Sequence, residues 1–122
     1  RIWESTRYTI KDIDVISLYD DYPAIVIAQL MDCELLPRVN LSEAITKLLA
    51  AQRPVINSSG GQLSAGQAGA GAGLQGVIEI ERALTDQGPV ATQGSRVGLV
   101  CGYGMVTYRY GSCANATVLE RA

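Results

Sequence analysis

Apolar residues along this chain form short continuous runs in some places and stripes at helical spacing in others. Residues 13–18 are almost continuously apolar, which is typical of a strand that is buried on both faces of a sheet. Residues 55–56 predict a second, short strand. Residues 74–84 carry apolar side chains three and four positions apart, which predicts a helix. This mixture of buried strands and amphipathic helices indicates an α/β fold.

Two more helices are predicted between these strands, and the chain opens on what reads as the tail of a helix over residues 3–8. Pro23 suits a first helical turn, and residues 24–33 are apolar almost all round, so we expect that helix to be buried. The pattern Asn-Leu-Ser-Glu is typical of a capping box, with Asn40 as the cap and Glu43 at the third position. A helix over residues 41–49 should follow it.

The last third of the chain predicts two strands, over residues 96–100 and 113–119, closed into a β-hairpin with a turn at 108–111. Before it, residues 66–73 alternate glycine with small side chains. They form either a flexible linker or a glycine-rich turn that leads into helix 74–84. The apolar stripe that follows favours the turn, whose N–H groups can approach an anion or a thioester oxygen closely. The spacing does not match a dinucleotide fingerprint.

Three motifs stand where predicted strands end. Residues 57–68 contain Asn-Ser-Ser-Gly-Gly and then Gly-Gln-Ala, residues 14–22 end in Tyr-Asp-Asp-Tyr, and residues 101–105 read Cys-Gly-Tyr-Gly-Met. In this order they resemble the C-terminal domain of the thiolase superfamily, over about residues 10–120. The second motif is closest to sterol-carrier-protein (lipid-transfer) thiolases and related steroid side-chain aldolases. Where that family has Gly-His-Pro, this chain has Gln67, and it contains no histidine.

The resemblance implies a thiolase-like C-terminal half: a mixed sheet with helices on both faces and a closing β-hairpin. Residues 1–122 would then be a partial domain, without the family's first strand and N-terminal half. Because that strand is central in the family's sheet, we expect a gap that leaves two unpaired strand edges. The family makes or breaks carbon–carbon bonds next to a coenzyme A thioester. This domain would belong to that chemistry as a fragment or subunit that is inactive alone.

The resemblance also implies roles for individual residues. Cys101 matches the cysteine that shuttles a proton, Gln67 the histidine, and Tyr19 the asparagine that holds a water. Residues of the same motifs would bind the substrate: Asn57, Gly60, Gly61, Gly66, Gly102 and Tyr103. A coenzyme A thioester would be the substrate, with no cofactor and no metal.

The class of activity stays open between acyl transfer and retro-aldol cleavage, which the steroid aldolases perform with two tyrosines. Tyr103 or Tyr22 are candidates for the second tyrosine, although packing beside the loop is the plainer interpretation of both. A non-catalytic scaffold subunit is an alternative, paired with an active thiolase-like subunit or a zinc-ribbon/OB-fold protein that binds acyl-CoA. A lipid-transfer module is a third.

The composition of the chain limits the kinds of partner that it can bind. The 122 residues suffice for one domain, and the 10 basic and 12 acidic residues are interspersed, so no basic patch favours nucleic acid. Residues 24–31, the longest apolar run, are too short to span a bilayer. With 48% hydrophobic residues, we expect apolar surface to be covered by a homo- or hetero-oligomeric partner. Because the chain begins with arginine, we expect it to be a piece of a longer protein.

Three widely spaced cysteines favour reduced thiols in packed positions of a cytoplasmic protein. With no Cys-x-x-Cys pair and no histidine, the sequence offers no zinc site.

Overall fold

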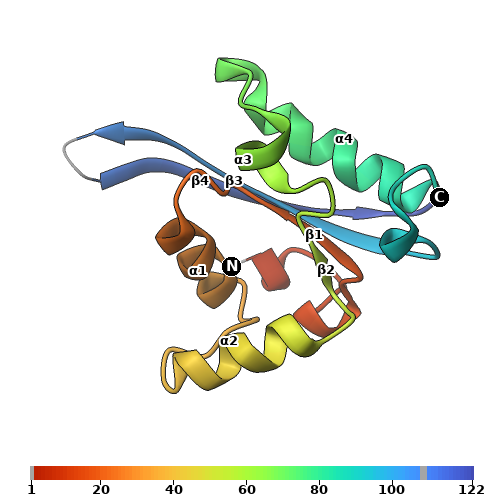
Figure 1. Cartoon of the computed structure of the whole chain (residues 1–122), viewed down its shortest axis with the longest axis horizontal. Coiled ribbons are helices and arrows are strands. Elements are labelled where there is room, and N and C mark those ends of the chain that lie inside the picture. The colour runs from red at the N-terminus through yellow and green to blue at the C-terminus, as the bar shows by residue number, and fades with distance from the viewer. Residues whose placement is uncertain (1, 108–109) are drawn as a thin grey trace.

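A four-stranded sheet runs through the centre of the computed structural model, which describes residues 2–107 and 110–122 (Figure 1). The strands are β1 (Val15–Leu18), β2 (Val55–Ile56), β3 (Val97–Thr107) and β4 (Tyr110–Glu120), in the order β2-β1-β3-β4. Strand β1 pairs in parallel with β2 and β3, while β3 and β4 are antiparallel. The predicted α/β class and mixed sheet are therefore confirmed.

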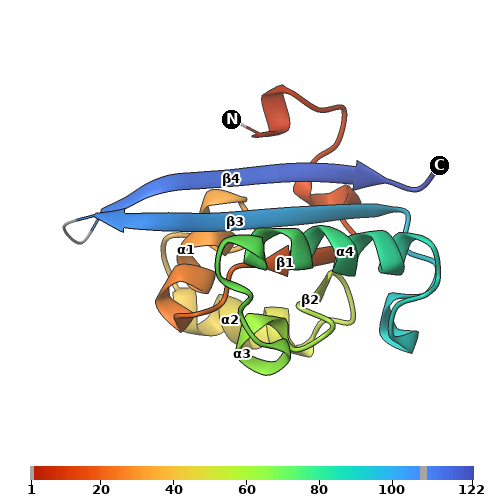
Figure 2. The ribbon, with the colours of Figure 1, turned by 90° about the horizontal axis from the view of Figure 1, so that it is seen from above.

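Helices cover both faces of the sheet, as predicted. Helices α1 (Pro23–Asp32) and α2 (Leu41–Ala50) lie on one face, and α4 (Ala72–Leu84) lies on the other (Figures 1 and 2). The short helix α3 (Gly61–Ala65) precedes α4, and a 3₁₀ turn over Gly69–Gly71 joins the two. The glycine-rich segment therefore leads into a helix. No helix within the described residues is long and apolar enough to cross a membrane.

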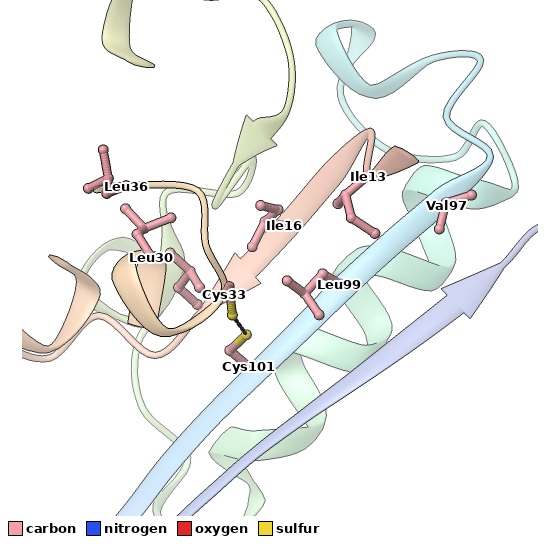
Figure 3. Packing of buried hydrophobic residues seen from close by; sticks show 9 residues of the cluster. Ile13, Ile16, Leu30, Cys33, Leu36, Val97, Leu99 and Cys101 are labelled. Atoms are coloured by element: carbon pink, nitrogen blue, oxygen red, sulfur yellow. Dashed lines mark hydrogen bonds between the residues drawn. The ribbon is translucent and has the colours of Figure 1, made fainter. Parts of the chain in front are cut away.

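The alternation of side chains along the strands divides the core into two clusters. Ile16 and Leu99 point towards α1 and α2, where they pack with Leu30 (Figure 3). Val15 and Val100 point the other way and pack against α4. Strand β1 is buried at all four positions, because each of its faces meets a helical layer.

The expected gap in the sheet is absent. Strand β1 pairs directly with β3, in a register that runs from Val15 opposite Gly98 to Leu18 opposite Cys101. The physical reason is that β3 satisfies the backbone groups that would otherwise remain unpaired along the edge of β1. The prediction of two unpaired edges at a missing central strand is therefore wrong for this structure.

The closing hairpin is confirmed, and its strands are longer than predicted. Residues 102–104 lie within β3, whose pairing with β4 extends from Val97 opposite Glu120 to Thr107 opposite Tyr110. Strand β1 pairs with β3 only as far as Cys101, so the hairpin of β3 and β4 extends beyond the rest of the sheet (Figure 2). Of the predicted turn, Tyr108 and Arg109 lie outside the described residues.

Three local expectations need correction. The predicted helical tail at residues 3–8 is only a 3₁₀ turn over Ile2–Glu4. Asn40 adopts a left-handed backbone (φ 53°) and its side chain makes no cap bond, while Glu43 pairs with Lys47 at 2.7 Å instead of completing a capping box. A capping asparagine normally has an extended backbone, which directs its side-chain oxygen at the helix N–H groups. The left-handed backbone of Asn40 does not.

Helix α1 is less buried than its apolar sequence predicted. Leu30 is its only fully buried residue, and Ala24 and Ala28 are exposed. One side of the helix packs on the sheet, and nothing in the described part of this chain covers the other side. An apolar helix needs two covered sides to be buried all round.

Candidate functional site

A cavity of about 430 Å³ lies on the α4 face of the sheet, at the carboxyl end of β1 and beside the middle of β3. Residues 17–19 and 100–104 form its floor, and the segment from Gly61 to Glu79 contributes its wall. In parallel α/β sheets, ligands bind at this end of the strands. Tyr19, Gln67 and Cys101 all contribute to the lining, so the three predicted catalytic residues lie around one cavity.

Tyr19 lies directly after β1, and its hydroxyl donates a hydrogen bond of 2.6 Å to Oδ2 of Asp21. This bond and burial raise the pKa of Tyr19 above 10, because the carboxylate binds the neutral hydroxyl and repels the phenolate. The Gln67 side chain lies close enough to the same hydroxyl to oppose the rise in pKa. Gln67 and Tyr19 are therefore near one another at the cavity.

The Tyr19 ring lies beside Tyr103, with the ring centroids 5.9 Å apart and the planes tilted by 40°. Tyr103 comes from β3 and also lines the cavity. The two tyrosines therefore pack together at the cavity. Tyr22, the other candidate for a second tyrosine, is not among the residues that line it.

Sequence reasoning missed the residue that holds Tyr19. The side chain of Gln29 in α1 donates to the Tyr19 carbonyl oxygen (Nε2 to O, 2.7 Å) and accepts from the Tyr19 N–H (3.3 Å to Oε1). These two bonds fix the main chain at the point where β1 ends. The available signal was that Gln29 is the one amide side chain in the apolar run 24–31.

Asn57 stabilises the site without lining the cavity. Its Oδ1 accepts from the Leu18 N–H (2.7 Å), and its Nδ2 donates to the Leu18 carbonyl (3.2 Å). The side chain thus continues the pairing of β1 where β2 ends, and Asn57 itself has a left-handed backbone (φ 45°). Of the predicted substrate-binding residues, Gly61, Gly102 and Tyr103 line the cavity, whereas Asn57, Gly60 and Gly66 do not.

The carboxylates of Asp20, which is buried, and Glu79, which is half-buried, hold the loop at residues 58–62 in place. Asp20 accepts from the Gln62 N–H (2.8 Å), and a side chain at Gly61 would collide with it. Glu79, which lines the cavity, binds the Ser17 and Ser58 hydroxyls and the Ser59 N–H at 2.7–3.1 Å. Sequence reasoning missed both roles, because each joins segments that are at least 20 residues apart.

The thiol of Cys101 does not point into this cavity. Its sulfur lies 3.6 Å from Sγ of Cys33, among the apolar side chains on the α1 face of the sheet (Figure 3). Because side chains alternate along a strand, Cys101 offers backbone to the cavity and its thiol to the opposite face. The bond to Cys33 and, after it, burial raise the pKa of the Cys101 thiol. That bond lowers the pKa of Cys33, because the Cys101 S–H stabilises the Cys33 thiolate.

The third cysteine differs from expectation. Cys33 and Cys101 are buried and packed as predicted, but Cys113 is exposed on β4. Among the described residues, no group of three or more histidine, cysteine, aspartate or glutamate side chains is placed to hold a metal ion.

Comparison with known proteins identifies the family of this chain. The family model described as "Thiolase C-terminal domain-like" matches residues 2–121, almost the whole sequence. No curated protein and no solved structure gives a significant match. The match covers the sheet, the helical layers on both sides of it and the cavity between the motifs. The chain therefore belongs to the thiolase C-terminal domain-like family.

Proposed function

We propose that this domain serves carbon–carbon bond chemistry on acyl-CoA thioesters, with the cavity at Tyr19 and Gln67 as the place where the thioester carbonyl binds. The observation that carries the proposal is that Gln67 and Tyr19 line the same cavity, beside the glycine-rich segment. Such chemistry passes through an enolate, and hydrogen-bond donors directed at its oxygen lower the barrier.

The charges around Tyr19 support Gln67 as the hydrogen-bond donor to the substrate. The Tyr19 proton is already held by Asp21, and the raised pKa keeps the hydroxyl neutral at pH 7. A glutamine amide has two N–H groups, so it can donate one to Tyr19 and the other to a substrate oxygen. In this arrangement Tyr19 orients the amide, and the amide stabilises the enolate oxygen.

Between the two reaction types, the geometry favours cleavage without a covalent acyl intermediate. Besides its nucleophile, acyl transfer in thiolase fashion needs a histidine and a cysteine that shuttles a proton next to the acyl group. The sequence has no histidine, and the Cys101 thiol lies on the other face of the sheet. A retro-aldol step needs an enolate stabiliser and a group that takes a hydroxyl proton, and Tyr103, which packs beside Tyr19 at the cavity, is the candidate for the second role.

The enolate itself provides the test. The protein is incubated with acetyl-CoA in D₂O, and the loss of the methyl proton signal is followed by NMR, with ligand-induced shifts of the Tyr19 and Gly102 amides as the binding readout. We expect binding at this cavity and faster proton exchange than in buffer alone. Gln67→Ala should reduce the exchange rate by roughly 100- to 1,000-fold, the scale of one lost oxyanion donor.

The matched control is Gln93→Ala, because Gln93 is an exposed glutamine away from the cavity. It should leave both readouts unchanged. Absence of acetyl-CoA shifts at the cavity, or exchange that is equally fast in the Gln67→Ala variant, would reject the proposal.

A second candidate function is a non-catalytic scaffold that pairs with a catalytic thiolase-like subunit or a zinc-ribbon/OB-fold protein in the cytoplasm. It is favoured by apolar side chains that α3 and α4 expose: Leu63 is 67% exposed, Leu74 65% and Ile78 57%. Burial of such side chains contributes about 1.5–3 kcal/mol each. A scaffold would bind its partner through this face and would show no acetyl-CoA exchange, so the same NMR experiment separates the two functions.

A further inference from the structure

A second cavity, of about 450 Å³, lies on the opposite face of the sheet from the candidate site. Cys33, at the end of α1, and Cys101, in β3, both line it, together with Gln29 and Asp32 of α1 and residues 114–116 of β4. Apart from the surface that faces this cavity, both cysteines are buried, with exposed fractions of 6% for Cys33 and 7% for Cys101. We refer to it as the dithiol cavity.

The two sulfurs are 3.6 Å apart and hydrogen-bonded, although 68 positions separate them in the sequence. A disulfide bond would bring them closer by about 1.5 Å, a distance that side-chain rotation and a small shift of the helix end can supply. We propose that Cys33 and Cys101 form a reversible disulfide, and that the dithiol cavity admits the small oxidant, a peroxide, that makes it.

The chemistry divides the roles of the two cysteines. Cys33 lies at the end of α1, whereas Cys101 is held within β3 between two neighbouring strands, so Cys33 is the sulfur that can move to attack, and the bond between the two thiols also lowers its pKa. Its thiolate takes one oxygen of hydrogen peroxide, the O–O bond breaks, and the departing hydroxide becomes water. The resulting sulfenic acid is attacked by the Cys101 sulfur, the S–O bond breaks, and a second water leaves with the Cys101 proton. Two thiols lose two electrons, and the peroxide is reduced to two waters.

The disulfide would act on the candidate site through α1. Cys33 lies four residues after Gln29, and the Cys33 N–H donates to the Gln29 carbonyl at 2.9 Å. The Gln29 side chain in turn holds both backbone groups of Tyr19. A bond from Cys33 to β3 therefore fixes the turn of α1 that positions Tyr19. We expect the oxidised protein to hold the Tyr19 main chain more rigidly.

The experiment uses a Cys113→Ser background, which removes the exposed thiol. After mild treatment with hydrogen peroxide, intact mass should fall by about 2 Da, and dithiothreitol should restore it. Peptide mapping should show a link between the peptides that contain Cys33 and Cys101. Tm should rise by about 5 °C or more, because the bond closes a long loop of the unfolded chain. Cys33→Ala in the same background should abolish the mass change.

Hydrogen exchange tests the connection to Tyr19 without reference to any catalytic activity. Oxidation should slow exchange of the Tyr19 amide by at least about threefold. Gln29→Leu should remove this effect while disulfide formation persists. Since both readouts are structural, failure of the proposed function would leave them untouched.

Three results would overturn the proposal. They are oxygen addition at Cys33 without a disulfide, a wild-type crosslink that joins Cys113 to another cysteine, and intact thiols under peroxide that oxidises a free cysteine peptide. If the Cys33→Ala variant does not fold, peptide mapping of the Cys113→Ser protein still decides the matter.

Discussion

Gln29 and Tyr19 are joined by two hydrogen bonds, one in each direction, between a side-chain amide and a main-chain N–H and C=O. The pairing of β1 with β3 ends at Leu18. The Gln29 amide thus satisfies the N–H and C=O of Tyr19, the next residue. Helix α1 and the candidate site are thereby connected by a single side chain.

Replacing Gln29 by leucine should loosen this point. Two half-buried backbone groups would lose their partners, and we expect the free energy of unfolding to fall by about 1–3 kcal/mol. Urea denaturation measures the loss, and amide exchange at Tyr19 locates it. Gln52→Leu, at an exposed position, is the control and should change stability little. An equal loss in both variants would mean that the two bonds contribute nothing specific.

The pKa of Tyr19 gives a prediction with a definite sign. Asp21→Asn removes the charge that raises this pKa, so the Tyr19 pKa should move down towards 10. Gln67→Ala removes the group that opposes the rise, so it should move the pKa further up. Ultraviolet difference titration of each protein against its Tyr19→Phe counterpart isolates this tyrosine from the other five.

The same shift affects stability at high pH. Because the pKa of Tyr19 is higher in the folded than in the unfolded chain, its contribution is complete below about pH 10 and is lost as pH rises through the folded pKa. The difference in stability between the wild type and Asp21→Asn should therefore shrink above pH 10. A difference that is constant from pH 7 to pH 11 would contradict the assigned cause.

Asn57 should be more important for stability than for binding. Asn57→Ala removes both bonds to Leu18 and places alanine at a positive φ, so we expect a loss of about 2–4 kcal/mol. Asn57→Asp is the informative comparison, because a carboxylate still accepts from the Leu18 N–H but cannot donate to the Leu18 carbonyl. The Tm of the Asn57→Asp protein should lie between those of the Asn57→Ala protein and the wild type. A stable Asn57→Ala protein would show that the two bonds are dispensable.

Sequence patterns were sufficient for the elements but not for the directions of side chains. The run at residues 13–18 and the stripe at 74–84 specify one strand and one helix, because a short continuous apolar run and a spacing of three to four residues each have a direct structural counterpart. In β3, however, Val97, Leu99 and Cys101 alternate with Gly98 and Val100, and both sets are compatible with a buried face. The pattern therefore could not tell which face receives the Cys101 thiol.

Long-range polar contacts were also beyond the sequence. Glu79 reads as one acidic position on a helix, yet it binds the hydroxyls of Ser17 and Ser58 across the fold. Asn40 shows the converse: its sequence context favours a helix cap, but its backbone is left-handed and its side chain makes no cap bond. Tertiary context decides such positions, and local propensity does not.

Thiolase activity should be absent from these 122 residues alone. They contain no histidine, Gln67 cannot take up a proton at neutral pH, and the Cys101 thiol points away from the cavity. An assay of acetoacetyl-CoA thiolysis should give only the background rate. Activity that depends on Cys101, lost in Cys101→Ala but kept in Cys113→Ala, would overturn this prediction and the assignment of the Cys101 thiol to the opposite face.

The last prediction concerns the exposed apolar face of α3 and α4. Leu63, Leu74 and Ile78 each expose more than half of their surface, although α4 packs its other side on the sheet. Apolar area contributes about 25 cal/mol per Å² when it leaves water, so contact with a second protein surface is favoured. We expect the isolated chain to associate, with a hydrodynamic mass above 13.0 kDa. Leu74→Glu with Ile78→Glu should return it to a monomer, while Glu81→Lys, at an exposed polar position of the same helix, should not. A wild-type chain that melts cooperatively as a 13.0 kDa monomer would show that this face needs no partner.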